Sequence, residues 1–167
     1  VKLLSRVIMD LADGEVKQGL YRFDTSQSFE TYFEKSYCKT ASLIANSSRA
    51  AGVLSECNPQ ELDSLYQFGR QLGLAFQVVD DILDLVATDE ELGKPSGNDL
   101  REGVYTLPVI RMIASDDPVV ALLGQPLDEQ TRDKARQAVV DGTEIATSKA
   151  TAEGFIGDAV KALDALP

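Results

Sequence analysis

Apolar positions recur at intervals of three and four residues along nearly the whole chain, which is the spacing of one face of an α-helix. Strands require four or more residues of strict apolar and polar alternation, rich in Val, Ile, Thr and aromatic residues, and no segment of the sequence has this pattern convincingly. The chain is therefore predicted to be all-α.

The predicted helices are separated by turn-prone or helix-breaking segments. They cover residues 1–18, 29–54, 59–86, 107–114, 117–123 (a short helical turn), 129–140 and 143–166, the last of which Gly154 could interrupt. Residues 93–98 (GKPSGN) are predicted to form a polar loop after the long central helix. We find no internal repeat and no linker, so a single domain over residues 1–167 is expected.

The start of helix 59–86 has a strong local signal. Asn58 is placed to accept hydrogen bonds from the first backbone amides, Pro59 suits the first helical position, and Glu61 completes a capping box. Ser28 is expected to cap helix 29–54 in a similar way.

The faces of the two longest helices differ in their apolar pattern. Helix 59–86 is apolar over more than one face, which predicts that it is largely buried. Helix 29–54 is expected to turn four residues inward, namely Tyr32, Phe33, Leu43 and Ile44.

Composition excludes several classes of function. Among 167 residues, 27 are acidic and 16 basic, and the resulting charge of −11 disfavours nucleic acid as a partner. The chain has no histidine, which excludes hydrolase triads and His-ligated zinc. Cys38 and Cys57 form neither a disulfide framework nor a zinc cage, and no apolar run of about 18 residues predicts a transmembrane segment. We expect a cytoplasmic protein.

Three carboxylates, Asp80, Asp81 and Asp84, interrupt an otherwise apolar stretch of the central helix. Asp80 and Asp84 are one turn apart, so their charges repel unless a cation or solvent screens them. Oxygen ligands on one helical face favour Mg²⁺, or Mn²⁺, completed by water and substrate phosphates. The alternative is an ordinary solvated acidic stripe.

Cationic and amide groups elsewhere in the chain could hold a diphosphate beside such a metal. They are Lys39, Thr40, Gln77 and Lys94. Taken singly, each fits a more ordinary role, such as a surface lysine, a helix-lining hydroxyl or a core amide. Only their combination with the aspartates indicates a site.

Four segments resemble motifs of the trans-isoprenyl diphosphate synthase, or polyprenyl synthetase, family. Residues 76–84 (FQVVDDILD) resemble its second aspartate-rich motif, and residues 92–99 (LGKPSGND) with Thr106-Leu107-Pro108 resemble the segment that follows it. Residues 14–18 (GEVKQ) and 37–44 (YCKTASLI) resemble its G-E-x-x-Q and Lys-Thr helices. The similarity covers essentially the whole chain and is nearest to the long-chain branch.

This resemblance implies an antiparallel helix bundle of the isoprenoid synthase type that binds Mg²⁺. It implies that the three aspartates bind the metal, and that Lys39, Thr40, Gln77 and Lys94 hold an allylic diphosphate and stabilise its departure. Isopentenyl diphosphate would be the second substrate. The family also forms homodimers, and its reaction does not require histidine.

The sequence departs from the family pattern in three ways, one of which is that the family's arginine-containing isopentenyl diphosphate pocket is missing. A first aspartate-rich motif has no counterpart here, and Val104 stands where the family commonly has lysine. Both ends also lack capping or tail residues. We therefore expect residues 1–167 to be the C-terminal portion of one prenyltransferase domain, with its N-terminal helices absent, and to be inactive alone.

Two other interpretations stay open. The chain could be a non-catalytic partner subunit that modulates a complete synthase. It could also be part of a class I terpene cyclase, although the sequence around Gln77 and the Gly-Lys loop favour the synthase.

Overall fold

The computed structural model of the protein describes residues 2–88, 90, 93, 96–115 and 117–166. Every regular element within these ranges is helical, which confirms the all-α prediction. The chain divides into two compact units: residues 1–17, 33–77 and 151–167 form the first, and residues 18–32 and 78–150 form the second.

The helices follow the predicted order, with one addition and one interruption. They are α1 (Lys2–Leu20), α2 (Phe29–Ser36), the π-helical turn η1 (Tyr37–Ala41), α3 (Ser42–Leu54), α4 (Pro59–Val86), α6 (Asn98–Glu102), α7 (Leu107–Ala114), the 3₁₀ turn η2 (Pro118–Leu122), α8 (Glu129–Asp141), α9 (Glu144–Ala162) and the 3₁₀ turn η3 (Leu163–Ala165). Helix α6 begins within the segment predicted as a loop, and Gly154 does not interrupt α9.

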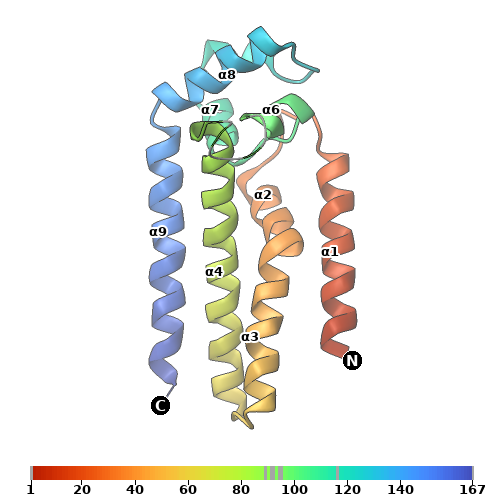
Figure 1. The fold of residues 1–167 in the computed structure, drawn as a ribbon, viewed down its shortest axis with the longest axis vertical. Helices are drawn as coiled ribbons and strands as arrows, with labels where there is room; N and C mark the ends of the chain where they lie inside the picture. The colour runs from red at the N-terminus through yellow and green to blue at the C-terminus, as the bar shows by residue number, and fades with distance from the viewer. Residues whose placement is uncertain (1, 89, 91–92, 94–95, 116, 167) are drawn as a thin grey trace. The chain divides into compact units, whose positions relative to one another are not determined.

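In the first unit, α3 and α4 lie side by side in antiparallel directions (Figure 1). Small residues allow the two backbones to approach closely. A Cβ atom on Gly69 of α4 would lie 2.7 Å from the Cα of Ala45, and one on Gly73 would lie 2.5 Å from the Cα of Ala41. Larger residues at these glycines would force the helices apart.

Helix α1 and the C-terminal helix complete this unit. Val7 of α1 is buried beside Leu43 and Asn46 of α3. The rings of Phe33 and Phe155 meet edge to face with centroids 5.5 Å apart, which joins α2 to α9.

The second unit has its core around α6, α7 and α8. Helix α8 packs on both α6 and α7. Almost fully buried residues fill the centre of this unit: Leu100, Tyr105, Leu107, Val109, Met112 and Val139. The Tyr105 hydroxyl accepts the backbone N–H of Gly124 at 2.6 Å, and its carbonyl accepts the Gln27 amide at 3.1 Å. Both bonds satisfy buried polar groups that would otherwise destabilise the core.

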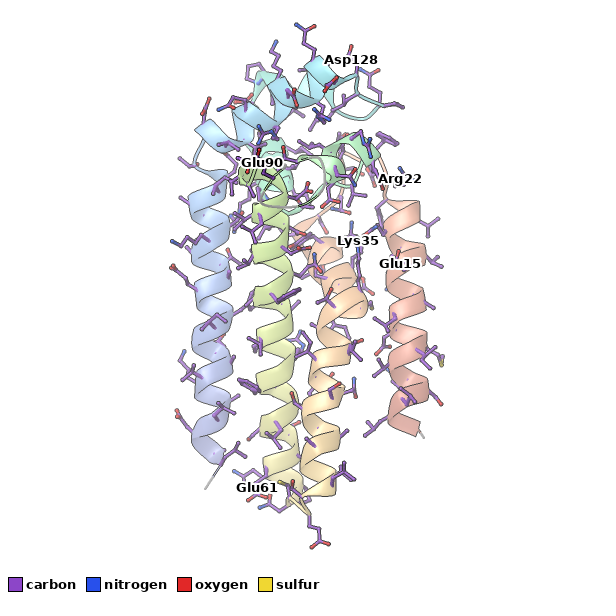
Figure 2. The ribbon with its side chains drawn as sticks, in the orientation of Figure 1. Glu15, Arg22, Lys35, Glu61, Glu90 and Asp128 are labelled. Carbon is purple, nitrogen blue, oxygen red and sulfur yellow. The ribbon has the colours of Figure 1, made fainter. Side chains whose placement is uncertain are left out.

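The predicted helix caps are confirmed. The Asn58 side chain accepts the backbone N–H of Glu61 at 3.0 Å, while the Asn58 N–H donates to the Glu61 carboxylate at 2.8 Å. Ser28 accepts the Thr31 N–H at 3.1 Å. A further cap, Asp128 at the start of α8, accepts the N–H of Thr131 at 2.7 Å (Figure 2).

The π-helical turn changes the faces of the predicted helix 29–54. Such a turn contains one extra residue, so the residues after it are rotated by about 100° relative to an uninterrupted helix. Tyr32, before the turn, is buried as predicted. Leu43, after it, is 45% exposed, so its predicted inward orientation is wrong.

The prediction that α4 is largely buried holds for one face of the helix and fails for the face that carries Phe76. Leu74, Ala75, Val78 and Leu85 are buried, but Phe76 is 60% exposed. Val79 and Leu83 share its exposed face. No helix in the described part of the chain is both long enough and apolar enough to cross a membrane.

Candidate functional site

The last turns of α4 carry the three candidate metal ligands. Asp81 and Asp84 are each only 3% exposed, whereas Asp80 is exposed. At about 100° per residue, Asp84 lies between Asp80 and Asp81 around the helix axis. The buried face therefore includes Asp81 and Asp84, and Asp80 stands at its solvent edge.

Asp81 is anchored by a tyrosine from α2. The Tyr32 hydroxyl donates to Asp81 Oδ2 at 2.6 Å, and Tyr32 is itself buried. This length is typical of a hydrogen bond between a hydroxyl and a charged carboxylate. The bond fixes the rotamer of Asp81 and compensates part of the cost of burying its charge.

Asp84 connects α4 to the segment that begins α6. Its Oδ2 accepts the backbone N–H of Asp99 at 3.2 Å, and its main-chain carbonyl accepts the N–H of Gly97 at 2.7 Å. Gly97 has a φ of +67°, which glycine adopts at little cost. Asp84 thus has a structural task in addition to its predicted role at a metal.

The donor chemistry of the three aspartates fits a hard divalent cation. Carboxylate oxygens are the ligands that Mg²⁺ prefers, and Mg²⁺ usually takes only one or two from protein. Among the residues that the structure describes, no three His, Cys, Asp or Glu side chains are gathered closely enough to hold a metal ion. A metal at these aspartates would therefore take further ligands from water or from a phosphorylated substrate.

The first unit brings together two of the residues predicted to bind diphosphate. The Thr40 hydroxyl, in η1, donates to Gln77 Oε1 on α4 at 2.5 Å. Because the amide oxygen accepts this bond, the amide nitrogen is the Gln77 group that can donate to an anion. Lys39 precedes Thr40 in the same turn and is half-buried. Lys94 lies outside the described residues.

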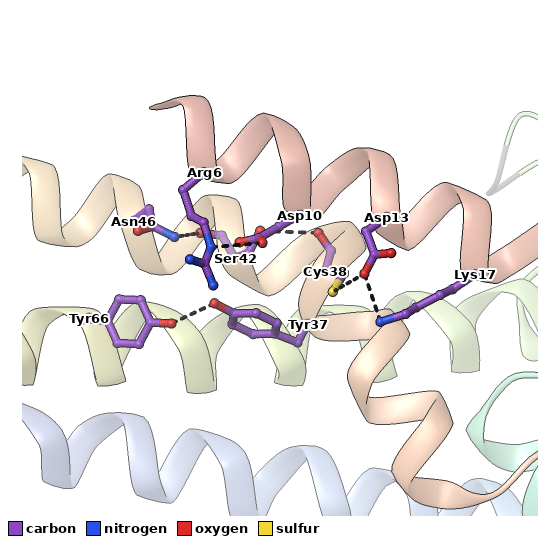
Figure 3. Close-up of polar contacts among 9 residues, drawn as sticks. All are labelled: Arg6, Asp10, Asp13, Lys17, Tyr37, Cys38, Ser42, Asn46 and Tyr66. Atoms are coloured by element: carbon purple, nitrogen blue, oxygen red, sulfur yellow. Dashed lines mark hydrogen bonds and ion pairs between the residues drawn. The ribbon is translucent and has the colours of Figure 1, made fainter. Parts of the chain in front are cut away.

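In the first unit, Lys17 of α1 and Cys38 of η1 both contact Asp13 (Figure 3). Lys17 bridges Asp13 and Glu34, and the hydrogen bonds with these two carboxylates raise the pKa of its ammonium group. Burial raises the pKa of the Cys38 thiol, so it is protonated and unreactive near neutral pH. Neither group was a predicted site residue.

The sequence profile of the family described as polyprenyl synthetase matches residues 1–141. The chain belongs to the polyprenyl synthetase family. This confirms the family resemblance found in the motifs.

Curated relatives extend the same similarity over the whole chain. A prenyl transferase of Cyanophora paradoxa is 41% identical over 168 residues, which cover 100% of this chain and 52% of that protein. A solanesyl diphosphate synthase 1, chloroplastic, of Arabidopsis thaliana is 39% identical over 168 residues, covering 100% of this chain and 41% of the relative. The chain thus spans about half or less of the length of these relatives.

Solved structures match the fold. The heptaprenyl diphosphate synthase of Staphylococcus aureus has a TM-score of 0.95 and 27% identity, with coverage of 99% of this chain and 53% of that one. A Caulobacter crescentus polyprenyl synthase, crystallised with calcium and isoprenyl diphosphate, has a TM-score of 0.93 and 32% identity, covering 99% and 52%. The fold is that of the isoprenoid synthases, and the names of the relatives support the long-chain type.

Proposed function

We propose that this polyprenyl synthetase chain provides the metal- and diphosphate-binding part of a prenyltransferase. The enzyme condenses isopentenyl diphosphate with an allylic diphosphate and forms a linear long-chain polyprenyl diphosphate. Residues 1–167 form a portion of its single all-α domain. The observation that carries the proposal is the trio of aspartates on α4, two of them buried and anchored, in a chain of this family.

In this proposal Asp80, Asp81 and Asp84 hold Mg²⁺, for which Mn²⁺ can substitute. When bound, the ion neutralises negative charge on the diphosphate and so favours its departure from the allylic carbon. The oxygen donor set supports this assignment. So does the related Caulobacter synthase, which was crystallised with calcium and isoprenyl diphosphate.

Lys39, Thr40, Gln77 and Lys94 hold the allylic diphosphate. An ammonium group, a hydroxyl and an amide are hydrogen-bond donors, and donors fixed in place stabilise the charge that develops on a departing diphosphate. The chain has no histidine to act as a base. The proton lost when the new carbon–carbon bond forms passes to the released diphosphate, so the reaction needs no histidine.

The test is a steady-state assay of the complete gene product that contains these residues, with Mg²⁺, isopentenyl diphosphate and a labelled allylic diphosphate. We expect long-chain product, and we expect Lys39→Ala to raise the KM for the allylic diphosphate. The 167-residue chain alone should form no product. If Lys39→Ala has the KM and kcat of the wild type, Lys39 does not bind the diphosphate. If the complete protein catalyses no prenyl transfer, the proposal is wrong.

A non-catalytic partner subunit is the second candidate. Helix α1 exposes large apolar side chains that a second chain could cover: Leu4, Ile8, Met9, Val16 and Leu20. If the chain is such a subunit, adding it to a complete synthase will change the rate or the product length. If it is part of the enzyme, we expect the complete protein to form a homodimer. A cytoplasmic location stays a prediction, since a similar plant synthase is described as chloroplastic.

A further inference from the structure

Lys39 and Thr40 lie in a π-helical turn, which the sequence pattern did not predict. In this turn, Tyr37–Ala41, the backbone N–H of Ser42 donates to the carbonyl of Tyr37, five residues earlier. Single π-helical turns within α-helices are rare and occur frequently at functional sites. An α-helical turn would place Lys39 and Thr40 at different angles around the helix axis.

Helix α1 approaches the π-helical turn through a glycine. A Cβ atom on Gly14 would lie 2.8 Å from the backbone nitrogen of Lys39 and 3.1 Å from the carbonyl carbon of Cys38. Any larger residue would therefore meet backbone, which cannot move aside as a side chain can. Gly14 is the first residue of the G-E-x-x-Q segment, whose role the proposed function leaves open.

Helix α4 approaches the same turn through a second glycine. A Cβ atom on Gly73 would lie 2.5 Å from the Cα and 2.8 Å from the Cβ of Ala41. One helical turn later, Gln77 of α4 accepts the hydrogen bond of Thr40. Two close backbone contacts thus enclose the turn. The Thr40 hydroxyl in this turn donates to Gln77, which is the third candidate site residue beside Lys39 and Thr40.

We propose that Gly14 and Gly73 are positioning residues that hold the π-helical turn in place, so that Lys39 and Thr40 are aligned for the allylic diphosphate. This inference rests on the proposed function. An added methyl group at either glycine forces the turn to shift or to return to α-helical spacing. A shift of about 1 Å in a substrate-positioning group can cost about 100-fold in rate.

The test compares four variants of the complete gene product. In Gly73→Ala and Gly14→Ala we expect the KM for the allylic diphosphate to rise about tenfold or more, with the KM for isopentenyl diphosphate unchanged. Gly69→Ala is the matched control, because its Cβ would also lie 2.7 Å from α3 backbone but one turn away from η1. It should lower stability and leave both KM values unchanged. Gly157→Ala, where no described atom lies within 4 Å of the added Cβ, should leave both KM values unchanged and should not lower stability, because alanine is favoured over glycine inside a helix.

A second readout does not depend on activity. Cys38 lies in the turn and is 7% exposed. In a Cys57→Ser background, a displaced turn should make Cys38 react faster with a thiol reagent in Gly14→Ala and Gly73→Ala than in Gly69→Ala. If Gly73→Ala folds poorly, Gly14→Ala still tests the positioning role, because the added Cβ is less crowded there. The reactivity of Cys38 in Gly14→Ala then gives the result.

The inference is overturned if Gly14→Ala and Gly73→Ala match Gly69→Ala in both KM values and in Cys38 reactivity. Lys39→Ala and Thr40→Ala, assayed in parallel, test the proposed function separately. If they weaken the allylic substrate and the glycine variants do not, only the positioning role fails. If they leave the kinetics unchanged, the proposed site itself fails, whatever the glycine variants do.

Discussion

Asp80, Asp81 and Asp84 belong to one sequence pattern but have three different environments. Asp81 is buried against the Tyr32 hydroxyl, Asp84 is buried against the backbone of Asp99, and Asp80 is exposed. Anchored carboxylates lose less conformational freedom when they bind a ligand, which favours binding. At the residue scale, Asp81 and Asp84 are therefore fixed by contacts within the protein, whereas Asp80 lies at the solvent edge.

Tyr32→Phe tests this positioning. Loss of the hydroxyl removes a buried hydrogen bond to Asp81, so we expect the free energy of unfolding to fall by about 1–3 kcal/mol. The affinity of the complete gene product for Mg²⁺ should fall about 10-fold or more, because a group that orients a ligand is lost. Urea unfolding and calorimetric titration with Mg²⁺ measure the two effects.

Tyr37→Phe is the control, since it removes the 2.7 Å hydrogen bond between the Tyr37 and Tyr66 hydroxyls in the other unit. It should lower stability without changing Mg²⁺ affinity. Equal Mg²⁺ affinity in Tyr32→Phe and the wild type would show that Tyr32 does not orient Asp81.

The candidate residues could be found from the sequence, but their partners could not. Three aspartates in an apolar helical stretch are a local signal, visible in nine consecutive residues. Tyr32 and Asp81 are 49 positions apart, and Thr40 and Gln77 are 37 apart. Such pairs depend on the tertiary fold, and nothing in the periodic pattern connects them.

At the scale of the elements, the caps were predictable and the π-helical turn was not. The Asn58 and Glu61 cap involves residues three positions apart, so the local sequence determines it. The π-helical turn is held by Gly14 and Gly73 from other helices. Helix α6 likewise begins where Asp84 accepts the Asp99 N–H, a contact from outside its own segment.

Asp128→Ala tests the cap of α8. The pKa of Asp128 is lowered from its ordinary value of 3.8 by the hydrogen bonds from Thr131. A lowered pKa in the folded state means that the carboxylate stabilises the fold above pH 3.8 and that this contribution is lost as the pH falls through the lowered value. The variant should therefore have a lower Tm than the wild type at pH 7, and the two should converge in strong acid.

Glu129→Gln is the control for loss of a negative charge near the cap: it removes one negative charge from the same helical turn, together with the 3.8 Å ion pair to Arg132, and leaves the cap in place. A thermal unfolding series from pH 7 to pH 2 provides the comparison. If the Tm difference for Asp128→Ala does not change across this range, its carboxylate does not act as the ionised cap.

Gly103→Ala tests the end of α6. Gly103 has a φ of +73°, and a Cβ there would lie 2.4 Å from the Phe23 ring. Gly93 has a similar φ of +66°, but no described atom lies within 4 Å of its Cβ position. We expect Gly93→Ala to lower the free energy of unfolding by about 1–2 kcal/mol, because of the left-handed backbone conformation alone. Gly103→Ala should lower the free energy of unfolding by about 1–3 kcal/mol more than Gly93→Ala, because the added methyl group would overpack against the Phe23 ring.

Urea unfolding of both variants measures this difference directly. If both variants lose the same free energy of unfolding, the Phe23 ring moves aside without an energetic cost. A larger loss in Gly93→Ala than in Gly103→Ala would contradict the packing described for α6.

At the scale of the whole molecule, composition and periodicity were sufficient for the fold class. Apolar spacing of three and four residues gave the helices, and the aspartate-rich and Lys-Thr segments gave the family, which the profile match over residues 1–141 confirms. Chain length relative to the family could not be read from periodicity. The missing first aspartate-rich motif predicts that the chain is a portion of a longer domain, and the comparison adds that the chain covers 52% of the Cyanophora paradoxa relative.

The net charge of −11 bears on function at the same scale. An acidic molecule repels diphosphate substrates unless cations intervene. Binding of a diphosphate by this chain should therefore depend on a divalent cation. We propose that this cation binds at the aspartates of α4.

The most direct test is the activity of Asp80→Asn in the complete gene product. Asp80 is exposed, so the substitution leaves the core and the Tyr32 contact intact. We predict that kcat/KM for prenyl transfer falls about 100-fold or more with an unchanged Tm. Asp63→Asn, an exposed aspartate near the start of the same helix, should behave as the wild type. Wild-type activity in Asp80→Asn would contradict the assignment of these aspartates to the catalytic metal.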